Sequence, residues 1–109
     1  MPSRTGRIRA LNDELRATGR GGIVLLTRGV AALPPPIQAA IIAAVREFQD
    51  FSVANDPHGE HDCATLEAAG HEVVFKFDYY DPSLRGRSPD PADPLMTRRV
   101  LTIMLADEY

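Results

Sequence analysis

Apolar residues recur at helical spacing in two segments of the chain. Between Thr5 and Thr18 they form a narrow stripe, and glycines follow directly as a stop signal. A broader stripe follows the proline triplet 34–36, and proline suits the first turn of a helix. The members of the broader stripe are Ile37, Ala40, Ile41, Ala44, Val45, Phe48 and Phe51. The pattern therefore predicts two amphipathic helices, the second one better defined.

Three further segments have the composition of strands. Ile23 to Thr27 is a continuous β-favouring run between glycines, which predicts a buried strand. Cys63 to Leu66 and Val73 to Tyr80 flank the turn signal Ala69-Gly70, as in a β-hairpin. The second of these alternates apolar and polar residues, so one face is expected to be core and the other wet.

The last run, Val100 to Leu105, is apolar on both faces and favours an interior strand, and a helix over 98–107 stays the alternative. The predicted order is α-β-α-β-β-β. It describes one α+β domain over residues 1–109, with two helices packed on one face of a mostly antiparallel four-stranded sheet. Residues 55–62 and 81–94 are expected to be loops, and in the second the aspartates before prolines can accept local backbone hydrogen bonds.

Composition narrows the class of protein. No apolar stretch approaches the length of about 18 residues that a membrane span needs, and the chain starts with an arginine-rich segment, so we expect a cytoplasmic protein without a membrane partner. Cys63 is the only cysteine, which excludes an intrachain disulfide, and we interpret it as a small buried hydrophobe. Glycine-rich nucleotide-binding motifs are absent, and we expect no cofactor.

The charge is divided unevenly along the chain. Residues 1–30 hold six arginines and two acidic residues, a balance of +4, whereas residues 31–109 hold six basic and thirteen acidic residues, a balance of −7. The arginines are interpreted mainly as a solvated helix face with ion pairs to Asp13. A DNA-binding accessory protein is the alternative that they support, although direct nucleic-acid binding is not favoured. The candidate nucleic-acid contacts of such an accessory protein are Arg4, Arg7, Arg9, Arg16 and Arg20.

The loop over residues 55–62 carries the densest group of chemically active side chains. Together with the next strand it offers carboxylates and imidazoles that can bind a divalent metal and activate water, as in a hydrolase or nuclease. The candidate ligands are Asp56, His58, Glu60, His61 and Asp78. The two histidines are three apart in a loop, which does not match the helical zinc-protease spacing. We therefore lean against an enzyme.

A structural explanation of the same loop competes with the metal site. In it, Asn55 and Asp56 make turn hydrogen bonds, Gly59 takes an unusual backbone angle, and Glu60 or His61 anchors the loop to an arginine, Arg28 or Arg46. Lys76 and Asp78, two apart on one strand, form either a polar ligand platform or an exposed ion pair.

Nearly the whole chain resembles a family of small bacterial proteins that is classified only as a domain of unknown function. The resemblance is carried by the segments Arg7–Asp13, Thr27–Val30, Asn55–Asp62, Asp78–Asp81, Ser88–Pro94 and Arg99–Tyr109. The family commonly has an aromatic residue at the position of His58. Many of its members are encoded on plasmids and integrated elements, which implies a context and no activity.

We therefore expect a small binding or inhibitor protein that acts by protein–protein contacts. The resemblance suggests an anti-defence role on a mobile element, against restriction or CRISPR machinery. The partner is expected to be a protein or a protein–nucleic acid complex, and basic surfaces on it would meet acidic side chains. The candidate contact residues are Glu60, Asp62, Asp78, Asp81, Asp90 and Asp93.

Overall fold

The first helix has the predicted position and a clear start and stop. The computed structural model describes residues 2–109, and α1 spans Arg4–Thr18. The hydroxyl of Ser3 accepts a hydrogen bond from the N–H of Gly6 at 3.0 Å, which satisfies one of the unpaired donors of the first turn. Gly19 ends the helix in the left-handed conformation, with φ of 77°. Ile8 and Leu15 are buried on its apolar stripe, as predicted.

A second long helix, α3, spans Pro35–Glu47 and begins at the proline triplet, as predicted. It ends before Phe48 and Phe51, which nevertheless pack into the core, with the ring centroids of Phe48 and Phe75 5.6 Å apart. A one-turn helix, α2, spans Arg28–Ala31. The sequence analysis did not predict this helix.

Four strands form one mixed sheet in the order β1-β4-β3-β2. Their bounds are β1 Ile23–Leu26, β2 Cys63–Ala68, β3 His71–Tyr80 and β4 Arg98–Leu105, and a short 3-10 helix, η1, follows at Ala106–Glu108. β1 is parallel to β4, and the other two pairings are antiparallel. The predicted α+β class is confirmed, with the order α-β-α-α-β-β-β, and residues 98–105 form a strand rather than a helix.

The predicted hairpin joins β2 to β3 through a two-residue turn. Ala69 and Gly70 have φ of 52° and 83°, as a type I′ turn requires, and this turn matches the twist of the strands that it joins. The register pairs Ala68 with His71 and Cys63 with Lys76. One face of β3 therefore points to the core and the other toward solvent, as predicted.

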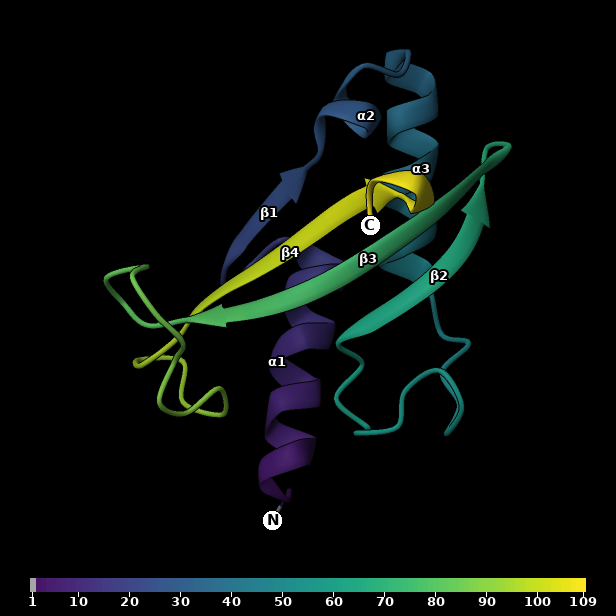
Figure 1. Ribbon diagram of the computed structural model, residues 1–109. Helices are drawn as coiled ribbons and strands as arrows, with labels where there is room; N and C mark the ends of the chain where they lie inside the picture. Colours follow the sequence, from purple (N-terminus) through teal and green to yellow (C-terminus); the bar gives the residue numbers. More distant parts are fainter. Residues whose placement is uncertain (1) are drawn as a thin grey trace.

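Both long helices lie on the same face of the sheet (Figure 1), and the core fills the space between them and the strands. The sequence placed both helices on one side, and this is confirmed. The buried core cluster consists of Leu15, Ile41, Val45, Ala64, Ala68, Val73, Phe75, Phe77, Leu101 and Ile103. Within residues 2–109, no helix has the length and apolarity to cross a membrane.

The strand predicted at residues 23–27 is present as β1, but the prediction that it is buried was wrong. β1 is an edge strand, and Ile23, Val24 and Leu25 are exposed. A continuous apolar run is typical of a strand that is covered on both faces and paired on both sides. Here only β4 pairs with it, so the local pattern does not match the position of the strand in the sheet.

Candidate functional site

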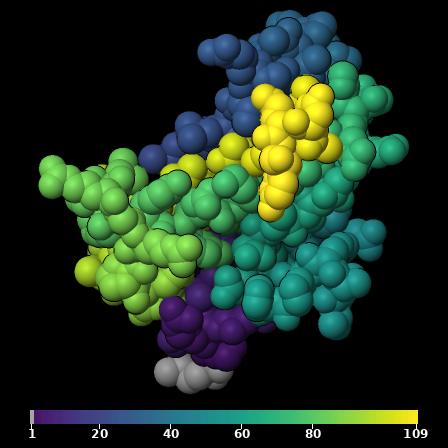
Figure 2. Space-filling view, in the orientation of Figure 1, coloured from purple at the N-terminus to yellow at the C-terminus, as the bar shows by residue number. Residues whose placement is uncertain are grey.

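The face of the sheet opposite α1 and α3 is hollowed into a shallow groove of about 680 Å³ that opens to solvent (Figure 2). We call it the sheet groove. Its floor is formed by Val100, Thr102 and Met104, which alternate with the core-facing residues of β4. Because successive side chains of a strand point to opposite faces, the same strand supplies both the core and this floor.

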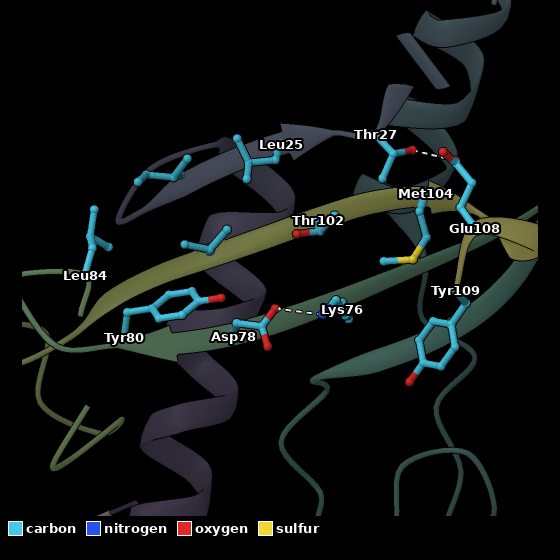
Figure 3. Close-up of a pocket in the computed structure, with 12 residues that line it drawn as sticks. Leu25, Thr27, Lys76, Asp78, Tyr80, Leu84, Thr102, Met104, Glu108 and Tyr109 are labelled. Atoms are coloured by element: carbon cyan, nitrogen blue, oxygen red, sulfur yellow. Dashed lines mark hydrogen bonds and ion pairs between the residues drawn. The ribbon is translucent and has the colours of Figure 1, made fainter. Parts of the chain in front are cut away.

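Large apolar and aromatic side chains form the rim of the sheet groove. Ile23 and Leu25 come from β1, Tyr80 from the end of β3, Leu84 from the following loop and Tyr109 from the C-terminal end (Figure 3). All five are exposed, whereas Val100 and Met104 on the floor are nearly buried beneath their neighbours. An apolar surface bordered by tyrosines is typical of protein contact sites.

One ion pair lies within the sheet groove. Lys76 Nζ is 3.1 Å from Asp78 Oδ2, so of the two interpretations from the sequence, the ion pair is present. The hydrogen bond that Lys76 donates to Asp78 raises the pKa of Lys76. Both side chains are partly exposed, and an exposed pair of this kind contributes at most about 1 kcal/mol to stability. Both charges can therefore rearrange toward a partner at low cost.

Glu108 of η1 closes one end of the sheet groove. Its carboxylate accepts hydrogen bonds from the Thr27 hydroxyl at 2.6 Å and from the N–H groups of Gly29 and Leu105 at 3.0 and 2.9 Å. The bond from Thr27 is the main reason that the pKa of Glu108 is lowered. These contacts hold the end of the chain against β1 and α2, which places Tyr109 beside the groove (Figure 3).

A buried polar network lies on the opposite face of the sheet, beside the middle of α1. Arg99 Nε donates to Asn12 Oδ1 at 2.7 Å, and Asn12 Nδ2 lies 2.7 Å from the Tyr79 hydroxyl and 3.1 Å from the Glu60 carbonyl. Arg99 also donates to the Pro91 carbonyl. Asn12 and Arg99 are almost fully buried. The network joins α1, the 55–62 loop, β3, β4 and the loop before β4.

Burial shifts the pKa values of two members of the network, Tyr79 and Arg99. Burial is the main reason that the pKa of Tyr79 is raised well above its ordinary value of 10.0 and that the pKa of Arg99 is lowered. The Arg99 guanidinium also lies 5.3 Å from the centre of the Tyr79 ring, a favourable cation–π geometry. A tyrosine that stays protonated in this way stabilises the fold, and it does not supply a phenolate oxygen as a nucleophile or base.

A second cluster anchors the 55–62 loop to α1. His61 Nδ1 is 2.8 Å from Asp13 Oδ1, and His61 Nε2 is 3.7 Å from Asp56 Oδ2. The His61 ring stacks on Phe51 with centroids 3.8 Å apart. Glu60 contacts the Tyr79 hydroxyl at 3.3 Å. Anchoring is therefore confirmed, but the predicted partners Arg28 and Arg46 were wrong. The side chains of His61 and Glu60 contact Asp13, Asp56 and Tyr79 instead.

The turn interpretation of the same loop holds in detail. Asn55 Oδ1 accepts from the Ser52 N–H at 2.7 Å, and Asp56 Oδ1 accepts from the His61 N–H at 3.2 Å. Gly59 has φ of 70°, a left-handed angle that glycine adopts without strain. Cys63 directly follows the loop, and burial raises the pKa of its thiol, which argues against an activated nucleophile.

The five candidate metal ligands are not brought together. Asp56 and His61 are neighbours, but His58 is exposed, Glu60 faces Tyr79 and Asp78 lies in the sheet groove on the opposite side of the sheet. Within the described part of the chain, no three histidine, cysteine or acidic side chains gather as a metal site would need. The imidazole of His61 is instead directed to Asp13.

The six candidate acidic contacts also separate. Asp81 accepts hydrogen bonds from the Ser83 hydroxyl and the Arg85 N–H, and the first lowers its pKa. Asp90 and Asp93 accept backbone N–H groups of their own loop, from Ala92 and Leu95, as the sequence predicted for aspartates before prolines. Asp62 and Glu60 are half-buried. Of the six, only Asp78 lies in the sheet groove.

The interpretation of the N-terminal arginines as a solvated face was wrong for Arg16. Its side chain is buried, donates to the Val45 and Phe48 carbonyls at 3.0 and 2.7 Å, and pairs with Asp13 at 3.1 Å. This buried arginine links α1 to the end of α3. Arg9 donates to the Gly59 carbonyl and Arg4 to Asp90. Arg7 and Arg20 make no ion pair within residues 2–109.

The sheet groove itself was missed by the sequence analysis, which assigned the apolar residues of β1 and β4 to the core. The number and length of the predicted helices did indicate that one face of the sheet would be left uncovered. Two helices of 15 and 13 residues are each about 20 Å long, and a four-stranded sheet is about 15–20 Å wide, so the pair covers one face only. Apolar residues on the second face of β4 are then left for a surface.

Residues 26–108 match a family described as a protein of unknown function, DUF3768. The chain belongs to the DUF3768 family. The matched segment holds α2, α3, β2, β3, β4 and η1, and therefore most of the sheet groove, whereas α1 and nearly all of β1 precede it. The resemblance to a domain of unknown function is confirmed. No curated protein and no solved structure matches the chain.

Proposed function

We propose that this protein is a binding module that contacts another protein through its sheet groove. The observation that carries the proposal is the exposed apolar rim on the face of the sheet that neither α1 nor α3 covers. Contiguous exposed apolar surface is costly in water, and soluble proteins keep it mainly where a partner covers it. Here it is continuous with an open sheet edge, so a partner can extend beyond the groove.

The composition of the groove supports a protein partner over a small ligand. Small-molecule sites are concave and bury most of their ligand, whereas this groove is shallow and open (Figure 2). Tyr80 and Tyr109 provide large contact areas at low conformational entropy cost, and each has a hydroxyl for hydrogen bonding. Lys76 and Asp78 supply one charge of each sign, which favours a specific orientation of the partner.

The alternatives that the sequence left open have less support. A metal-dependent hydrolase needs ligands that converge, and the five candidates are divided between the two faces of the sheet. A DNA-binding accessory needs free cations on one surface, but Arg16 is buried and Arg4 and Arg9 are hydrogen-bonded to other parts of the chain. Partner binding through the groove requires neither arrangement.

A capture experiment with matched variants tests the proposal. Leu25→Glu and Tyr109→Glu place a charge on the groove rim, while Val53→Glu places the same charge on an exposed apolar residue of another loop. Each variant is first shown to be folded by circular dichroism. We expect a bacterial protein that is retained by the wild-type chain and by Val53→Glu but lost with both groove variants. Equal retention by all four chains, or no retained protein, contradicts the proposal.

A narrower form of the proposal concerns the biological role. The resemblance to proteins of plasmids and integrated elements motivates an inhibitor of host restriction or CRISPR machinery as the specific form of this binding. If so, expression of the chain raises the survival of an incoming plasmid in a defended host, and Tyr109→Glu abolishes that effect. Survival that is equal with and without the protein refutes this role but leaves binding by the groove intact.

A further inference from the structure

The outer side of β1 is an open edge of the sheet (Figure 1). Within residues 2–109, β1 pairs only with β4, in parallel register, with Ile23 opposite Val100 and Leu26 opposite Ile103. The N–H of Thr27 donates to the carbonyl of Ile103, and in a parallel ladder alternate residues bond to the same neighbour. The peptide groups of Val24 and Leu26 therefore point to the open side, where they can pair with another strand.

This edge lacks the features with which proteins protect exposed strands. Natural edges carry charges, proline or bulges that discourage pairing. β1 carries none of these, and Ile23, Val24 and Leu25 are 36%, 40% and 49% exposed. The opposite edge of the same sheet, β2, has an exposed glutamate, Glu67. Only one of the two edges is therefore suited to accept a further strand.

Both faces of β1 have space for the side chains of such a strand. On one face Ile23 and Leu25 border the sheet groove. On the other, Val24 and Leu26 border a hollow of about 230 Å³ that also reaches Ile42 of α3. A strand that alternates its side chains along β1 would direct them toward these two depressions in turn. The apolar run of β1, unexpected at an edge, suits the interior position that it would then occupy.

The charges beside β1 indicate the chemistry of the partner. Arg20 precedes the strand and Arg28 follows it, both are exposed, and no acidic residue lies between them in the sequence. The carboxylate of Glu108 lies near Arg28, but it is occupied by hydrogen bonds from Thr27 and Gly29. Among residues 2–109 neither arginine forms an ion pair. Antiparallel pairing of β1 with β1 of a second copy would bring two arginines together at each end, which is unfavourable. A strand with acidic ends would instead be attracted at both ends.

We propose that β1 receives an extended segment of a partner protein as a fifth strand, apolar in its centre and acidic at its ends. This inference rests on the proposed function and specifies how the partner binds. Main-chain hydrogen bonds to Val24 and Leu26 would supply affinity, the two depressions would select apolar side chains, and Arg20 and Arg28 would select the acidic ends.

A random peptide library displayed on phage, selected against the full chain, tests the proposal. Segments of about ten residues are long enough to span a strand of this length. We expect enriched peptides with central alternating apolar residues, acidic ends and little proline. Val24→Pro removes an outward N–H at a position where an edge strand tolerates proline, and we expect it to weaken binding of an enriched synthetic peptide about tenfold or more. Val24→Thr keeps the N–H and is its matched control.

Reversing the charges of the two arginines beside β1 tests whether they select the acidic ends of the peptide. Arg20→Glu with Arg28→Glu should weaken the acidic peptide about tenfold and strengthen a version with lysine ends, whereas Arg7→Glu, at the far end of α1, should do neither. Enriched peptides that are basic, or that bind Val24→Pro as well as wild type, overturn the inference. A dimer of the wild-type chain in analytical ultracentrifugation that is dissociated by Val24→Pro also overturns the inference, because β1 would then pair with a second copy.

The same measurements separate this inference from the proposed function. Peptides whose binding is lost with Tyr109→Glu but unaffected by Val24→Pro and by both arginine reversals leave the sheet groove as the binding site and refute strand addition. No enriched peptide and no groove-dependent partner in the capture experiment refute both.

Discussion

Asn12 is the residue through which the buried network can be tested most directly. Its side chain accepts a hydrogen bond from Arg99 and contacts the Tyr79 hydroxyl and the Glu60 carbonyl, and it has no exposed surface. Asn12→Ala removes all three contacts at once. The guanidinium loses a buried acceptor, which costs about 1.5–3 kcal/mol, and the two neutral groups lose about 1 kcal/mol each.

The expected loss of stability is therefore about 3 kcal/mol. The three lost contacts together amount to about 4 kcal/mol, and alanine returns about 0.7 kcal/mol because it is the better helix former. A domain of this size has a total unfolding free energy of about 5–15 kcal/mol, so the variant should still fold. At about 5 °C per kcal/mol, its melting temperature should fall by about 15 °C.

Urea unfolding followed by circular dichroism measures this difference. The control is Glu14→Ala, on the exposed side of the same helix, which should change stability by less than about 0.5 kcal/mol. Asn12→Asp keeps an acceptor for Arg99 and should fall between wild type and Asn12→Ala. A loss below about 1 kcal/mol for Asn12→Ala refutes the reasoning, because it would mean that the Arg99 guanidinium finds other partners without cost.

Three further predictions concern other contacts. The lowered pKa of Glu108 contributes stability above its ordinary value of 4.5 that is lost as the pH falls through the lowered pKa, so the urea midpoint of Glu108→Gln should depend less on pH between about 5 and 3 than that of wild type. A Cβ at Gly22 would lie 2.3 Å from the Arg99 carbonyl oxygen, so Gly22→Ala should cost about 2 kcal/mol in the same unfolding assay, whereas Gly86→Ala, with ordinary contacts, should be neutral. Because burial raises the pKa of Tyr79, its ionisation at high pH should coincide with unfolding, and the corresponding step in ultraviolet absorbance should vanish in Tyr79→Phe; a step that precedes unfolding contradicts the burial argument.

Local features of the sequence predicted most of the elements correctly. The Ala69-Gly70 turn, the alternation of β3 and the proline triplet before α3 each state a short-range constraint: a positive φ, a two-residue period, a restricted first turn. The aspartates before prolines in residues 81–94 were predicted to accept local hydrogen bonds, and all three of them do. Such features depend on neighbours within a few residues, so they can be read without the fold.

The errors share one cause, which is that burial is decided by distant parts of the chain. Arg16 was assigned to a solvated face because it shares one flank of the helix with other arginines and lies three residues after Asp13, yet the carbonyls at the end of α3, about 30 residues away, enclose it. The partners of His61 are equally remote, since Asp13 lies 48 residues earlier. The loop was predicted to be anchored, but its partners depended on where α1 packs.

The sequence by itself determined the α+β class, the hairpin and the placement of both helices on one side of the sheet, and it favoured a strand over residues 100–105, because periodicity and turn chemistry act over short distances. Tertiary structure alone decided that β1 lies at an edge, that the carbonyls at the end of α3 enclose Arg16, and that an apolar groove faces solvent. The same alternation that buries one side of β4 against the helices leaves its other side for a partner, and only the sheet order determines which strand stands at the open edge.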